Sequence, residues 1–192
     1  MGSPLHVAFV GGATGPWRVD RLEAVRGEGL PVVERLSVLE AGDMPLPEGA
    51  VWVLRGVSSN ERYVTRAEHQ ALTERQRPLG RPAATSAALI PVRKNDQWWD
   101  LPQDERRAIF EERSRHIGIG LEYLPEVARR LHHGRDLGEE FDFLTWFEYP
   151  PTHANAFEEL VTRLRQTDEW SYVEREIDIR LRRDVDQTHP RN

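Results

Sequence analysis

Apolar residues follow two alternating patterns along the chain. Short runs of Val, Ile, Leu and aromatic residues are bounded by Gly or Pro clusters, as is typical of strands. Between them stand longer polar segments in which apolar residues recur every three or four positions, the spacing of an amphipathic helix. The short runs predict strands at Leu5–Val10, Val32–Leu39, Ala50–Val57, Ser86–Val92, Phe141–Tyr149 and Ser171–Leu181.

The longer segments predict helices at Thr65–Gln76, Leu101–His133 and Asn155–Gln166. The first should begin at Thr65, because Glu68 follows at the spacing of a capping box, in which each side chain bonds the other residue's backbone N–H. Gly118, Gly120 and Pro125 should divide the second into two helical pieces, because Gly and Pro disfavour helix interiors.

Strands and helices alternate in both halves of the chain, which favours an α+β fold with two ferredoxin-like halves in one subunit. We assign residues 1–85 to the N-terminal half, residues 86–183 to the C-terminal half, and residues 184–192 to a flexible polar tail. Because no linker composition separates the halves, we expect one compact body.

Composition narrows the class of protein. The 192 residues carry a formal net charge of −6 and contain no Cys, which excludes disulfides, thiolate metal sites and a cysteine nucleophile. The acidic balance argues against a nucleic-acid partner. No apolar stretch reaches the roughly 18 residues of a membrane span, and the start of the chain lacks a signal-peptide pattern. We therefore expect a cytoplasmic protein with no nucleic-acid or membrane partner.

A glycine-rich segment, Gly11–Gly15, follows the first predicted strand, where dinucleotide-binding proteins carry their phosphate turn. Arg18 stands where that pattern needs its third Gly, and Pro16 and Trp17 occupy the first turn of the helix that should follow. We therefore favour a glycine-rich hairpin or loop over a nucleotide site.

The paired histidines His132 and His133 do not form a convincing metal site with Asp136 and Glu139. Adjacent residues on a helix point about 100° apart, so the two imidazoles would not converge on one ion. We interpret them as the solvated last turn of a helix, where positive charge suits the helix dipole.

His116 differs, because Gly118 and Gly120 follow it and remove side chains from a helical face that a flat, bulky group could approach. An imidazole can bind a metal through one nitrogen if the other finds an acceptor. The alternative is a buried, hydrogen-bonded core histidine. Arg129 could hold a small oxyanion, or it could be a solvated arginine like its neighbour Arg130.

A set of motifs in a fixed order carries a family resemblance: Leu54–Tyr63, Leu89–Lys94, Trp98–Pro102, His116–Arg129 and Phe141–Glu148. With them the chain, from about Val51 to Arg182, resembles the chlorite dismutase family of heme proteins. The resemblance implies a dimeric α+β barrel type of fold, with heme b held in the C-terminal half. The short chain resembles the compact branch of the family, which implies a homodimer.

The resemblance also implies roles for single residues. His116 matches the proximal heme ligand and the metal-binding residue, Glu169 the carboxylate that accepts its N–H, and Arg129 the distal, catalytic arginine. The remaining expected cofactor contacts are Asn60, Tyr63 and Lys94 at the heme propionates, Trp98 at the heme edge and Ile90 in the apolar wall.

The implied activity is that of a heme b oxidoreductase that converts chlorite to chloride and dioxygen through a ferryl and hypochlorite pair, with Arg129 holding the hypochlorite. A second branch of the family decarboxylates coproheme with a tyrosine at the position of Ile90 and without the distal arginine. Ile90 and Arg129 disfavour that activity here. A heme-binding or heme-sensing protein of the same family remains an alternative.

Overall fold

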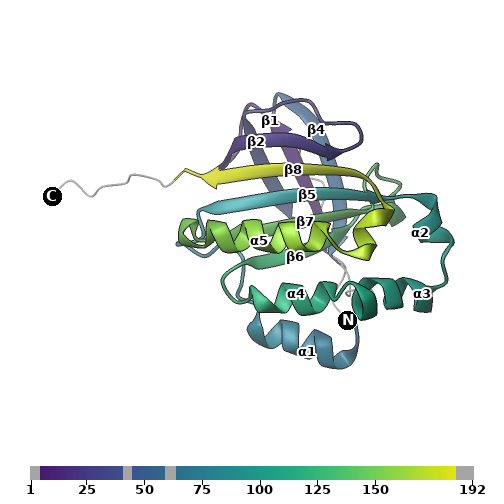
Figure 1. The fold of residues 1–192 in the computed structure, drawn as a ribbon. Coiled ribbons are helices and arrows are strands. Elements are labelled where there is room, and N and C mark those ends of the chain that lie inside the picture. Colours follow the sequence, from purple (N-terminus) through teal and green to yellow (C-terminus); the bar gives the residue numbers. More distant parts are fainter. Residues whose placement is uncertain (1–4, 41–44, 59–63, 185–192) are drawn as a thin grey trace.

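A computed structural model describes residues 5–40, 45–58 and 64–184 of the chain. Within them, eight antiparallel strands close into one barrel, and helices cover part of its outer surface (Figure 1). The strands are β1 (Leu5–Gly12), β2 (Trp17–Arg26), β3 (Arg35–Glu40), β4 (Ala50–Ser58), β5 (Ser86–Lys94), β6 (Ala128–His133), β7 (Phe143–Tyr149) and β8 (Val173–Arg183).

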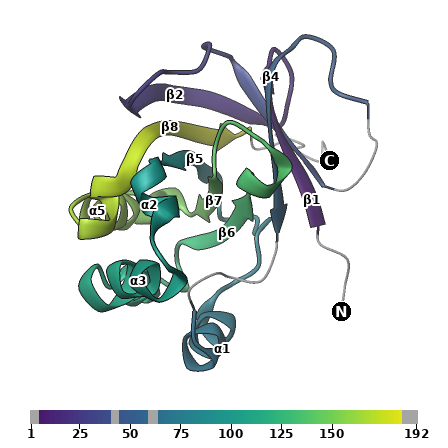
Figure 2. The same ribbon diagram turned by 90° about the vertical axis from the view of Figure 1, so that its right-hand side faces the viewer.

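The helices are α1 (Arg66–Arg75), α2 (Asp96–Asp100), α3 (Gln103–Arg107), α4 (His116–Glu122) and α5 (Ala154–Arg165). A π-helical turn, η1 (Ala108–Arg113), lies between α3 and α4. Short 3-10 turns form at η2 (Arg135–Leu137), η3 (Pro151–His153) and η4 (Asp168–Tyr172). No helix lies between β1 and β4 in the described residues, so the helices gather on one side of the barrel (Figure 2).

The strand order around the barrel is β1-β3-β2-β8-β5-β7-β6-β4. The first four strands therefore stand in the order β4-β1-β3-β2, and the last four stand in the corresponding order β8-β5-β7-β6. The two sets join along β2 and β8 on one side and through the single pair Val57 and His133 on the other. The α+β class is confirmed, whereas the boundaries at 1–85 and 86–183 stay a prediction.

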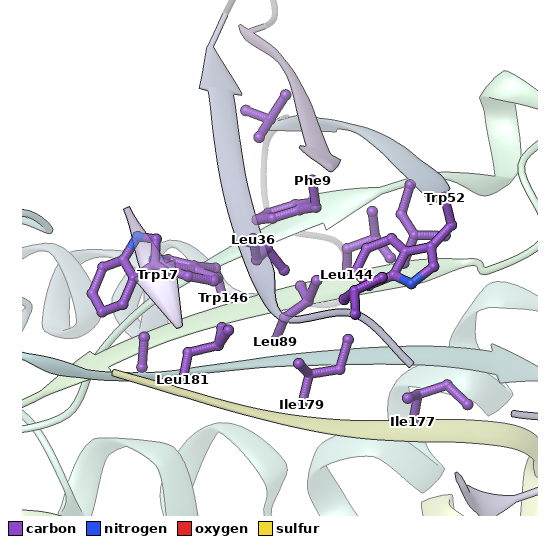
Figure 3. Close-up of a cluster of buried hydrophobic side chains, with 14 of the residues drawn as sticks. Phe9, Trp17, Leu36, Trp52, Leu89, Leu144, Trp146, Ile177, Ile179 and Leu181 are labelled. Carbon is purple, nitrogen blue, oxygen red and sulfur yellow. The ribbon is translucent and has the colours of Figure 1, made fainter. Parts of the chain in front are cut away.

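The inside of the barrel is filled by apolar side chains from both sets of strands (Figure 3). On β8, Ile177, Ile179 and Leu181 point into this core at the period of two that a strand imposes. The residues that alternate with them, Glu176, Asp178 and Arg180, are also buried. Arg165 of α5 covers Glu176 and Asp178 with ion pairs of 2.6 and 2.8 Å. Burial on both faces explains why β8 shows no clean alternation of apolar and polar residues.

Two predicted helices form as expected. Thr65 and Glu68 make both hydrogen bonds of the capping box before α1, at 2.7 and 3.3 Å. Helix α5 buries its apolar face against the outer surface of β5 and β7, and the residues that it contributes are Phe157, Leu160, Val161 and Leu164. The capping box was the signal for α1, and the helical spacing of apolar residues was the signal for α5.

The predicted helix over Leu101–His133 is wrong in its last part, because residues 128–133 form strand β6. This strand pairs with β7 from Ala128 opposite Glu148 to His133 opposite Phe143. His132 and His133 are consequently buried at 2% and 4% exposure and do not form a solvated helix end. Burial lowers the pKa of His132 to about 4.

The glycine-rich segment contains the end of strand β1, at Gly11 and Gly12, and the loop that follows at residues 13–16, and packing explains its glycines. A Cβ at Gly11 would lie 2.3 Å from the indole of Trp52, and Gly15 adopts φ +141°, which a side chain would strain. Strand β2 was missed, because most of its residues are exposed and half of them are charged. The tail predicted for residues 184–192 lies outside the described residues except for Asp184.

Among the described residues, no helix combines the length and the apolar character that crossing a membrane requires.

Candidate functional site

A cavity of about 240 Å³ lies between the outer surface of β5, β6 and β7 and the helices α1, α4 and α5. Six of the residues expected at the site line it, and they come from five different elements. They are Ile90, Lys94, Trp98, His116, Arg129 and Glu169. Asn60 and Tyr63 lie outside the described residues. The apolar part of the lining includes Ile90, Val92, Leu131, Phe143, Phe147, Val161 and Leu164.

His116 is the first residue of α4 and lines the cavity. Its Nδ1 lies 2.7 Å from Oε2 of Glu169. Because an ionised carboxylate only accepts hydrogen bonds, Nδ1 carries the hydrogen, and Nε2 is left as the ring nitrogen for a metal. The ring of Phe110 stacks on the imidazole at 4.4 Å between centroids, which fixes the plane of the ring.

Glu169 lies in η4 with only 4% of its surface exposed. Its Oε1 accepts a hydrogen bond of 2.8 Å from Lys94 Nζ, and its backbone N–H donates to Ser114 Oγ at 3.0 Å. Burial alone would raise the pKa of this carboxyl, but the charges and hydrogen bonds of His116 and Lys94 lower the pKa to about 2. The carboxylate is therefore ionised and able to polarise the imidazole.

Lys94 has a different environment from the one expected at a heme propionate. Its ammonium is buried, bonds both the carboxylate and the backbone carbonyl of Glu169, and lies 4.7 Å from the ring centroid of Trp98 and 5.3 Å from that of Trp170. The only lysine of the chain is thus joined to His116 through Glu169. Residues 94 and 169 stand far apart in the sequence, so no local pattern could have revealed this pair.

Arg129 lies on β6 and reaches the same cavity from the sheet side. Its guanidinium lies against α4, where a Cβ at Gly120 would be 3.1 Å from Nη1. Because the chain reverses between α4 and β6, Arg129 and His116 share one cavity without belonging to one helix. Ile90 on β5 belongs to the same wall and is buried.

Several cavity residues were not found from the sequence. Leu72 of α1 and Gln76, which caps the end of that helix, line the cavity, and only the tertiary fold brings the helix there. Trp170 stacks on His116 at 6.4 Å, and its position directly after Glu169 was the available signal. The local sequence around Phe110 carries no mark of its contact with the imidazole.

A scan against protein families matches residues 44–184 to the model described as chlorite dismutase. The chain belongs to the chlorite dismutase family. A solved structure of dimeric chlorite dismutases from Nitrobacter winogradskyi is 54% identical, with a TM-score of 0.86, and the match covers 93% of this chain and 99% of that one.

Two further relatives are more distant. The curated chlorite dismutase of Ideonella dechloratans is 35% identical over 86 residues, which are 45% of this chain and 28% of that protein, so the match spans under a third of the relative. A solved chlorite dismutase from Candidatus Nitrospira defluvii in complex with imidazole is 20% identical, with a TM-score of 0.61, over 92% of this chain and 90% of that one. This last likeness concerns the fold alone.

Proposed function

We propose that the protein is a heme b oxidoreductase that converts chlorite to chloride and dioxygen. The observation that carries the proposal is the buried series Lys94, Glu169 and His116 beside a cavity that Arg129 also lines. Such a carboxylate raises the basicity of an imidazole ligand, as outer partners of metal-binding histidines do. Membership of the family agrees with this assignment.

The residues around the cavity fit heme b. His116 offers Nε2 to iron while Nδ1 bonds Glu169, and the apolar lining suits the macrocycle. Gly120, one helical turn after His116, leaves its face of α4 without a side chain. Trp98 is proposed at the heme edge and Asn60 and Tyr63 at the propionates, whereas Lys94 is reassigned to holding Glu169.

Arg129 is the proposed catalytic residue. Bound heme supplies an iron centre that can take up an oxygen atom of chlorite and return it. The guanidinium of Arg129, a permanent cation, would bind the chlorite anion and then retain the hypochlorite that is left when chlorite gives up one oxygen. Holding both partners in one cavity makes their recombination effectively unimolecular. The overall reaction is balanced, since one chlorite gives one chloride and one dioxygen.

Ile90 and its apolar neighbours would exclude water from the reacting anions. Ile90 is buried in the wall of the cavity, and isoleucine can neither relay a proton nor form a side-chain radical. This residue therefore favours chlorite conversion over the decarboxylation of coproheme.

The experiment that tests the function is heme titration followed by an oxygen-electrode trace with chlorite. The chain should bind heme and release dioxygen on addition of chlorite. His116→Ala should lose the heme absorption band of the bound form and the oxygen release. An unchanged band in that variant would overturn the ligand assignment, and heme binding without oxygen release would favour the heme-binding or sensing alternative.

We further propose a homodimer of subunits that each contain two ferredoxin-like halves. The Nitrobacter winogradskyi structure, which is described as dimeric, supports the assembly, and the matching strand orders of the two sets support the halves. Light scattering that gives the mass of one chain would contradict the dimer. The cytoplasmic location stays a prediction.

A further inference from the structure

Helix α4 begins without a side-chain cap of its own. Arg115 occupies the N-cap position at φ +52° and makes no capping hydrogen bond with its side chain. The first backbone N–H groups of any helix lack partners within the helix. Here the N–H groups of Ile117 and Gly118 both donate to Glu111, at 2.6 Å to Oε2 and 3.2 Å to Oε1. A carboxylate from the preceding turn thus completes the start of α4.

Glu111 lies in the π-helical turn η1, next to Phe110. The two neighbours act on the same residue from two sides, because Phe110 stacks on the imidazole of His116 and Glu111 bonds the two amides that follow it. Single π-helical turns inside helices are frequent at functional sites. Through Phe110 and Glu111, the turn η1 therefore contacts both the ring of His116 and the backbone that follows it.

We propose that Glu111 is a positioning residue for His116. Its carboxylate fixes the first turn of α4, so that the imidazole keeps Nδ1 on Glu169 and can present Nε2 to the heme iron. Charge-assisted hydrogen bonds are the stronger kind, and a negative charge at a helix N-terminus is favourable. The inference rests on the proposed function for its effect on heme, but not for its effect on α4.

The test compares Glu111→Gln with Glu112→Gln, which makes the same change at an exposed neighbour in the same turn. Glutamine keeps the length of the side chain but loses the charge and one acceptor oxygen. In protein prepared without heme, the amides of Ile117 and Gly118 should exchange with solvent about tenfold faster in Glu111→Gln, a loss of about 1.4 kcal/mol of local protection. Glu112→Gln should match the unsubstituted chain.

The second readout uses the heme-loaded protein. Glu111→Gln should release heme about tenfold faster, lower the ferrous iron–histidine stretching frequency and raise the reduction potential, because a less firmly held imidazole is polarised less by Glu169. A role in stability alone would lower the melting temperature without moving the stretching frequency. Glu111→Asp, which is shorter, should give intermediate values and replaces Glu111→Gln if that variant does not fold.

The inference is overturned if Glu111→Gln shows unchanged amide exchange and an unchanged stretching frequency, or if Glu112→Gln changes both equally. If the unsubstituted chain takes up no heme, the proposed function is wrong, and the exchange measurement still decides whether Glu111 fixes α4.

Discussion

Gly120 has no side chain, and the guanidinium of Arg129 lies beside it in the space that a side chain would restrict. Because the guanidinium lies where a Cβ would crowd it at 3.1 to 3.4 Å, the bare face of α4 sets how far Arg129 can extend across the cavity. At Gly118, on the same helix, the nearest atom to such a Cβ is 3.5 Å away, which is ordinary contact. The two glycines therefore have different roles.

Gly120→Ala should weaken the binding of anions by Arg129. Gly118→Ala is its matched control, because both substitutions raise helix propensity by the same amount. We expect the affinity of the heme-loaded protein for azide and its kcat/KM for chlorite to fall about tenfold in Gly120→Ala, which corresponds to about 1.4 kcal/mol. Absorption titration and oxygen release measure these quantities. Equal values for the two variants would show that Gly120 does not position Arg129.

Arg129→Ala should retain heme, because His116 and the apolar lining are unchanged, but it should lose most dioxygen release. In other enzymes, the loss of one preorganised group that stabilises the reacting anion lowers the rate about 10²- to 10³-fold, and we expect a similar loss here. Hypochlorite should then escape, and a chlorination-sensitive dye in the solution would detect it. Dioxygen release at the rate of the unsubstituted protein would show that Arg129 does not have this role.

The elements differ in how far the sequence predicted them. Strands β4 and β5 and helices α1 and α5 were recognisable, because Gly, Pro or capping residues bound them. Strand β6 was assigned to a helix, because the apolar residues from 109 to 127 have helical spacing and nothing but Pro125 marks the reversal. Strand β2 offered no clear apolar pattern, and its pairing with β3 and β8 defines it.

Strand β6 carries a buried group that couples stability to pH. His132 is 2% exposed, its Nδ1 lies 3.2 Å from the carbonyl of Leu144, and burial lowers its pKa from 6.5 to about 4. Because the unfolded chain binds this proton at a higher pH than the folded chain, the free energy of unfolding falls as the pH decreases from 6.5 to about 4. The full effect is about 3 kcal/mol.

His132→Gln should make the free energy of unfolding depend less steeply on pH within that window, because the amide cannot take up the proton but can still donate to Leu144. Denaturant unfolding at pH 7 and pH 4.5 measures the difference. His6→Gln, at an exposed position on β1, is the control and should leave the dependence unchanged. Parallel curves for His132→Gln and the unsubstituted chain would contradict the assignment.

At the scale of the whole molecule, the outer surface of the barrel at β5, β6 and β7 forms one wall of the cavity. The strands β5 and β7 present apolar side chains to the barrel core on one face and to the cavity on the other. The family resemblance predicted the contact between His116 and Glu169, but it placed Lys94 at a heme propionate and not on Glu169. The joining of Lys94 to Glu169 and the arrival of α1 at the cavity depend on closure of the barrel.

Gly11→Ala should destabilise the barrel without touching the site, because the added Cβ would lie 2.3 Å from the Trp52 indole inside a close-packed core. Overpacking of this kind costs about 1–3 kcal/mol. Gly29→Ala is the control, since the nearest atom to its Cβ would be 3.7 Å away. Thermal unfolding should show a lower midpoint for Gly11→Ala alone, with heme affinity retained, and equal midpoints would contradict the packing argument.

Isotope labelling of chlorite tests most directly whether the cavity retains hypochlorite until the two oxygens of one chlorite join. The heme-loaded protein is given a mixture of chlorite with two heavy oxygens and chlorite with two light oxygens, and the dioxygen released is analysed by mass spectrometry. We predict dioxygen that carries either two heavy or two light atoms. Release of dioxygen with one of each in statistical proportion, or no release by a heme-loaded protein, would contradict the account.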